Sequence, residues 1–190
     1  MLTTIGADGH AKKNPAHSNV EPISDKESAY FPDGSNIVRI EQLPWTPFKS
    51  GSLDLSGSVF KLLSIDWQRD MFTMILIVPG GVELPSHYHL ENAHGYIMTG
   101  NFRYEAGTIF GGDYTMEAGS TEHTAILGKE DILQLSIIFG GICNVLEDGR
   151  PDLKNFIGCK EIYRLAKANG AAGHIVPPPP GWRSVYETEQ

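Results

Sequence analysis

Short apolar segments separated by glycines and polar turns dominate the middle of the chain. The segment 71–78 (MFTMILIV) is apolar and rich in β-branched residues on both faces, which is typical of a strand inside a sheet. Segment 59–67 mixes apolar and polar positions, and the polar residues 68–70 between the two segments predict a hairpin turn. Further turns are marked by Gly100, Gly107, Gly111 and Gly112. This pattern predicts a series of short antiparallel strands.

A helical pattern occurs in segment 160–170 (KEIYRLAKANG), where apolar residues share one face and Gly170 is a suitable end. Segment 131–149 predicts another hairpin, which turns at residues 140–141. Many strands with almost no helix predict an all-β fold. A jelly-roll barrel (double-stranded β-helix) with one short C-terminal helix suits the pattern best.

Three parts of the chain differ in composition. Residues 1–36 are rich in Gly, Pro, Asn, Ser and His without a sustained period, and we expect them to form a flexible arm. Residues 37–172 contain the strand pattern and form the expected barrel domain. Residues 173–190 include the run VPPPPG, which favours an extended tail. This tail could dock on the barrel or on a partner subunit, and the sequence leaves both open.

Composition narrows the classes of function. A chain of 190 residues with 41% hydrophobic residues is long enough for one well-buried domain. Its net charge of -8 argues against binding to nucleic acid or to an anionic membrane surface. The chain has no apolar run that could span a bilayer, and its start lacks the apolar core of a secretory signal. Because Cys143 and Cys159 form no C-x-x-C pair, we expect two free thiols in a cytoplasmic protein.

Three histidines carry the strongest chemical signal. His87 and His89 are two residues apart, so on a strand both imidazoles point to the same face. His123 comes 34 residues after His89, beyond several short strands, and a strand returning beside the first could bring it to the same point. Three neutral imidazoles around one point are typical of a transition-metal site with open positions. The sequence therefore predicts a metal bound by these three residues.

The spacing around the histidines resembles the two cupin motifs. Gly81, His87-x-His89 and Gly100 look like the first motif, and the segment from Gly111 to His123 looks like the second. The glutamate of the family's first motif is missing, since Ala93 and His94 stand in its region. In the second motif Glu117 stands in place of the usual proline, and the histidine comes one residue later than usual.

Within the cupins, residues 40–165 are similar to the ChrR-like proteins and, more specifically, to the 2,4'-dihydroxyacetophenone dioxygenases. The segments AHGYIMTGNFRYE, YTMEAGSTEHT and FGGICNVLEDG carry this resemblance. It implies non-haem iron(II) on three histidines, and oxygen-dependent cleavage of a carbon–carbon bond in a small chelating ketone. It also implies a homodimer or homotetramer. Zinc or nickel would bind the same ligands more tightly and could replace iron in a purified sample.

Candidate catalytic residues lie between the two motifs. His94 could donate a hydrogen bond or take up a proton beside the metal, and we expect it to face the same cavity without ligating. Tyr96 and Arg103 are further candidates, since Arg103 could meet an anionic substrate. Glu91, His94 and Glu122 remain open as a fourth ligand. Two other classes of function also remain open: a zinc-binding regulator of the ChrR type, and a small-molecule-binding or isomerase-type cupin.

Overall fold

The computed structural model describes residues 28–30, 35–50, 53–104 and 107–187. The chain divides into two compact units, Met1–Arg39 and Ile40–Gln190. In the first unit, strands β1 (Ala29–Tyr30) and β2 (Asn36–Ile37) pair in antiparallel fashion. The predicted N-terminal arm, residues 1–36, lies mostly outside the described residues, so its flexibility stays a prediction.

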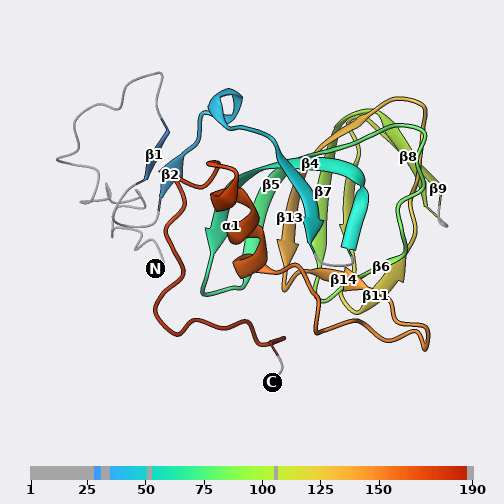
Figure 1. Cartoon of the computed structure of the whole chain (residues 1–190). Coiled ribbons are helices and arrows are strands. Elements are labelled where there is room, and N and C mark those ends of the chain that lie inside the picture. The colour runs from blue at the N-terminus through green and yellow to red at the C-terminus, as the bar shows by residue number, and fades with distance from the viewer. Residues whose placement is uncertain (1–27, 31–34, 51–52, 105–106, 188–190) are drawn as a thin grey trace, which may run out of the picture. The chain divides into compact units, whose positions relative to one another are not determined.

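The second unit is organised by a six-stranded antiparallel sheet with the order β10-β7-β13-β5-β4-β3 (Figure 1). We call it the main sheet. The predicted strand 71–78 matches β5, and the hairpin turn at 68–70 joins β5 to β4 as expected. The strands are β3 (Thr46–Ser50), β4 (Leu53–Asp66), β5 (Met71–Val78), β7 (Ala93–Thr99), β10 (Tyr114–Glu117) and β13 (Ile132–Phe139).

The described part of the second unit also contains two three-stranded sheets (Figure 1). One has the order β11-β6-β14 and is formed by β11 (Thr121–His123), β6 (His87–His89) and β14 (Ile142–Asn144). The other has the order β12-β8-β9 and is formed by β12 (Ile126–Leu127), β8 (Asn101–Tyr104) and β9 (Gly107–Phe110). A short 3-10 turn at Ile40–Gln42 precedes β3. The predicted all-β jelly-roll architecture with one helix is confirmed.

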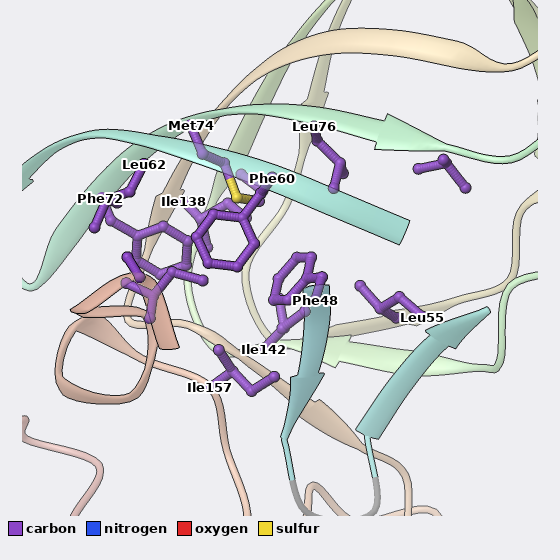
Figure 2. Packing of buried hydrophobic residues seen from close by; sticks show 14 of the residues in the cluster. Phe48, Leu55, Phe60, Leu62, Phe72, Met74, Leu76, Ile138, Ile142 and Ile157 are labelled. Carbon is purple, nitrogen blue, oxygen red and sulfur yellow. The ribbon is translucent and has the colours of Figure 1, made fainter. Parts of the chain in front are cut away.

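An apolar core lies on the inner face of the main sheet. Figure 2 shows Phe48 and Phe60 gathered with Met74 beside the strands of this sheet. The rings of Phe48 and Phe60 meet edge to face with centroids 5.4 Å apart, a favourable arrangement for aromatic pairs. Ile142 and Ile157 from the C-terminal half close the same core. Burial of this apolar surface is the main force that holds the curled sheet together.

Helix α1 (Cys159–Ala168) confirms the predicted helix. Its apolar side chains Ile162 and Ala166 are fully buried, and Gly170 follows with a φ of +69°, the left-handed conformation typical of a helix end. Among the described residues, no helix is long and apolar enough to cross a membrane.

The predicted hairpin at 131–149 is wrong. β14 pairs with β6 in the small sheet, and β13 lies between β5 and β7 in the main sheet. Gly140 and Gly141 have φ values of +67° and +114°, which turn the chain from one sheet into the other. A side chain at Gly141 would also collide with the carbonyl of Ile157, only 2.4 Å from an added Cβ.

The proline-rich tail packs on its own barrel. The indole N–H of Trp67 donates to the carbonyl of Val176 at 2.8 Å, and Trp182 stacks edge-on against Trp67 with centroids 4.9 Å apart. Farther along, the hydroxyl of Tyr186 donates to Glu91 at 3.0 Å. The sequence left the docking place of the tail open, and these contacts show that it covers the body of the same chain.

Candidate metal centre

Strands β6 and β11 bring the three histidines together. His87 and His89 point to the same side of β6 and are 6% and 4% exposed. β11 runs antiparallel beside β6 with His123 directly opposite His87. Because directly opposite residues share a face of an antiparallel pair, the third imidazole joins the first two without any special loop geometry.

The imidazole nitrogens converge on one point. The candidate ligand atoms of the three histidines all lie within 4.8 Å of one another, and Nε2 of His87 is 2.9 Å from Nε2 of His123. Both ring nitrogens of His89 are buried, and neither has a hydrogen-bond partner among the described residues. Buried polar atoms normally have partners, so an unpaired imidazole aimed at two others fits a metal ion.

The protonation state of His87 suits ligation. Nδ1 of His87 lies 2.9 Å from the carbonyl oxygen of Pro85, an arrangement in which Nδ1–H donates and Nε2 keeps its lone pair for the centre. Burial, followed by the neighbouring His123 and His89, lowers the pKa of His87 to about 4. The ring is therefore neutral at physiological pH, which is the form that binds metals.

A buried carboxylate completes the cluster. Oε2 of Glu117, at the end of β10, lies 3.0 Å from Nε2 of His89 and 3.6 Å from Nε2 of His123. Burial alone would raise the pKa of Glu117, but the adjacent imidazoles outweigh burial and lower the pKa, so the side chain is a carboxylate.

Sequence reasoning missed Glu117 as a member of the site. In the strand register Glu117 lies directly opposite Ala93, the position that aligns with the missing glutamate of the first cupin motif. The carboxylate beside the histidines therefore comes from β10, the strand that pairs with β7, and not from β7 itself. Two signals together could have found it: the small residue Ala93 at the usual place, and an acidic residue where a proline is usual.

The cluster opens into a small apolar cavity of about 70 Å³. Tyr104 packs against His123 with ring centroids 5.1 Å apart. Two polar residues of β13 also line the cavity, and the amide of Gln134 donates to the hydroxyl of Ser136 at 2.8 Å. The remaining wall is aliphatic and aromatic, with Phe48, Leu76, Leu84, Phe102, Ile132 and Ile142 among its members.

The predicted catalytic residues His94, Tyr96 and Arg103 are not brought to this cavity. On β7 the buried residues Ala93 and Ile97 face inward, so His94 and Tyr96 point to the outer face of the sheet. His94 there contacts the hydroxyl of Tyr114 through Nδ1. Arg103 is exposed, because its neighbours on β8 take the inward positions. The expectation that His94 faces the metal cavity is therefore corrected.

The two other candidate carboxylates also lie elsewhere. Glu122 is exposed and accepts a hydrogen bond from Ser86, since it pairs with Tyr88 on the opposite face of β6 from the histidines. Glu91 accepts the hydrogen bond from Tyr186 of the tail. Neither Glu91 nor Glu122 therefore reaches the histidine cluster, where Glu117 is the adjacent carboxylate.

Comparisons with known proteins agree with this architecture. Residues 33–139 match the family described as ChrR Cupin-like domain. No curated protein sequence matches the chain significantly. An RmlC-like cupin protein from Ralstonia eutropha JMP134 has a similar structure, with a TM-score of 0.59 and 24% identity over 73% of this chain and 88% of the other.

Two further solved structures share the fold. A protein from Methylibium petroleiphilum PM1, provisionally assigned as an acetylacetone dioxygenase, has a TM-score of 0.57 and 20% identity over 76% of this chain and 96% of its own. An acetylacetone dioxygenase from Acinetobacter johnsonii has a TM-score of 0.54 and 18% identity over 84% of this chain and 97% of its own. At these identities the likeness concerns the fold.

Proposed function

The chain belongs to the family of ChrR cupin-like domains, and we propose that it is an iron(II)-dependent dioxygenase that cleaves a carbon–carbon bond in a small hydroxyketone or diketone. The observation that carries this proposal is the buried cluster of His87, His89 and His123 at the wall of an apolar cavity. The shared fold of acetylacetone dioxygenases supports it.

Each part of the site has a role in this proposal. His87, His89 and His123 would hold the metal through imidazole nitrogens, and iron(II) would supply Lewis acidity and the redox chemistry needed to activate oxygen. The aliphatic wall keeps water away from the reacting atoms. Oε2 of Glu117 would accept the proton that a hydroxyl or enol group of the substrate loses on binding. A carboxylate suffices for this transfer, because hydroxyl groups on divalent cations are far more acidic than free ones.

The cavity favours a small substrate. Its volume of about 70 Å³ is roughly half that of a cavity of about 150 Å³ that holds benzene. An acyclic diketone or hydroxyketone therefore fits this space better than an aryl ketone does. The amide and hydroxyl of Gln134 and Ser136 form a polar spot in the apolar wall, suited to a further hydroxyl or carbonyl group of the substrate.

Oxygen uptake tests this function. The apo-protein, reloaded with iron(II) without air, should consume one molecule of oxygen for each acetylacetone and release one carboxylic acid and one dicarbonyl product. 2,4'-Dihydroxyacetophenone should react more slowly. His87→Ala should lose uptake, whereas Glu122→Gln, an exposed neighbour of the centre, should keep it. If no member of a broad ketone panel causes uptake in a sample with full iron occupancy, the proposal is wrong.

One observation favours a second function. Structural zinc sites have four protein ligands, and the three histidines with Glu117 form such a set. A zinc-binding regulator of the ChrR type is therefore the alternative. Under this alternative the purified chain retains zinc through dialysis, the iron form is inert towards ketones, and zinc removal changes the affinity for a protein partner. Loss of ketone turnover on chelation, with recovery on iron(II) addition, would exclude it.

A further inference from the structure

Large apolar side chains gather on the outer face of the main sheet, on the side opposite the metal cavity. On β7, Tyr96 and Met98 are 48% and 47% exposed, and on β10, Tyr114 and Met116 are 65% and 53% exposed. Phe110, at the end of β9 in the sheet β12-β8-β9 and four residues before β10, is 56% exposed. We call these five residues the outer patch. Clusters of exposed apolar side chains mark interaction sites in soluble proteins.

The strand register shows that the patch continues across the sheet. Tyr114 lies opposite Tyr96, which lies opposite Leu135 of β13, and Leu135 lies opposite Ile75 of β5. Residues directly opposite in antiparallel strands share a face, so these four side chains form one apolar row, whose exposed part ends at Leu135 because Ile75 is only 7% exposed.

A second row runs beside the first. Met116 lies opposite His94, which lies opposite Ile137. Neither row contains Asp or Glu, and the first row meets a charged residue only where Lys61 of β4, 5% exposed, lies opposite Ile75. β10 is also the outermost strand of the main sheet, a position that soluble proteins usually protect with charged side chains. The charged residue of β10, Glu117, faces inward, and the outward residues Tyr114 and Met116 carry no charge, so the outer face itself is open to cover by another surface.

We infer that the outer patch is the interface with a second copy of this chain, in a two-fold symmetric dimer. Large side chains offer roughly 200 Å² each when fully exposed, so the five half-exposed residues offer about 500 Å². That is more than half of the roughly 800 Å² that each partner buries in a stable complex, before the adjoining row residues are added. Tyr, Phe and Met are also the residues enriched in the cores of interfaces.

Charge favours a second copy over a different protein. The chain has a net charge of -8, so a basic partner would be recognised through carboxylates, and the two rows offer none. Two copies of an acidic chain, in contrast, associate best through a face that keeps their carboxylates apart. A flat sheet face that packs on its own copy by a two-fold rotation needs no complementary charge.

The inferred interface lies behind the wall of the metal cavity. Met116 of the outer patch immediately precedes Glu117, which faces the histidines, and Ser136 of the cavity stands between Leu135 and Ile137. A partner packed on the outer face would therefore brace β10 and β13 from behind. We expect dimer formation to tighten metal binding, measurable with zinc independently of any ketone chemistry.

Sedimentation of the full chain tests the inference. The wild type at micromolar concentration should have twice the 20.8 kDa mass of one chain. Met116→Lys should weaken the dimer at least 100-fold, because each copy then buries an unpaired charge. Ile126→Lys is the matched control, since Ile126 is a strand residue with 51% exposure in a different sheet, and it should leave the dimer intact. Circular dichroism would check that both variants are folded.

Several outcomes would overturn the inference. They are a monomeric wild type, an unchanged dimer in Met116→Lys, or a dimer lost in Ile126→Lys instead. A photoreactive benzoylphenylalanine at Met98 identifies the occupant directly. It should cross-link two chains through β7 and β10 in a pure sample. A cross-link to residues 1–27 of the same chain would assign the face to that segment, and one to an unrelated protein would assign it to another partner.

Discussion

The substitution Glu117→Gln tests whether the carboxylate of Glu117 acts on the bound metal or only lies near it. Gln keeps the size and shape of the side chain but removes its negative charge. In the wild type the carboxylate oxygen is 3.0 Å and 3.6 Å from two of the candidate ligand nitrogens. Metal–imidazole bonds of roughly 2.0–2.2 Å would place an ion on those nitrogens within reach of the same oxygen.

The size of the effect follows from this position. Removing a charged group that supports a metal site typically lowers affinity by about 10–100-fold, which corresponds to roughly 1.4–2.8 kcal/mol. We therefore expect Glu117→Gln to bind zinc about 10–100-fold more weakly than wild type, and His89→Ala to bind more weakly still. Competition with a coloured chelator at fixed pH measures both affinities.

Glu122→Gln is the matched control for this experiment. It removes an equal charge next to His123 in sequence, but from the exposed face of β11. Its zinc affinity should stay within about threefold of wild type, because exposed charges are screened by solvent. If Glu117→Gln and Glu122→Gln bind zinc equally well, the assignment of Glu117 to the metal centre is refuted.

Three further predictions concern the tail, a buried acid and the cavity. Trp182→Ala should lower the free energy of unfolding by roughly 2–3 kcal/mol in a urea titration, because it removes the ring packed on Trp67 and a hydrogen bond to the Trp67 carbonyl. Burial raises the pKa of Asp70 above its usual 3.8, so the stability that this residue contributes is lost as the pH rises from 3.8 through the raised value. Asp70→Asn should therefore raise the melting temperature at neutral pH but not at about pH 3, and an equal effect at both pH values would contradict this reasoning. Gln134→Leu should keep the metal but raise the KM for ketones that carry an extra hydroxyl group about tenfold more than the KM for ketones without one. Equal KM changes for the two kinds of ketone would argue against a contact between Gln134 and the substrate.

The grouping of the histidines was predictable because it depends on local rules. An i, i+2 pair on a strand has one possible direction, and a returning antiparallel strand brings His123 opposite His87. The strand 71–78 and the helix after residue 158 were predictable for a similar reason, since their apolar patterns match the period of the element.

The position of Glu117 could not be predicted in the same way. It depends on which residue of β10 lies opposite Ala93, and that register joins strands whose connection is long. The pairing of β14 with β6 is a similar case, because a glycine pair can close a hairpin or move the chain to another sheet.

The direction of His94 and Tyr96 was ambiguous for a different reason. In the segment 93–98 the odd-numbered residues are small or apolar, and the even-numbered ones are largely aromatic or apolar. Hydrophobic alternation therefore does not reveal which set of side chains faces the core. The structure resolves the ambiguity through packing: Ala93 and Ile97 are buried, and Tyr96 is exposed. Because both faces are apolar, the sequence does not show which side is buried, and the same exposed apolar face is the basis for the dimer interface that we infer.

The metal content of the wild type and of His89→Ala tests the central claim most directly. After reloading with iron(II) without air and removal of free metal, elemental analysis of the wild type should find one iron per chain. His89→Ala should retain almost none while keeping its strand-rich circular dichroism spectrum, because buried His89 offers one of the three converging imidazole nitrogens. Equal metal content in a folded His89→Ala variant would contradict the assignment of the three histidines as a metal centre.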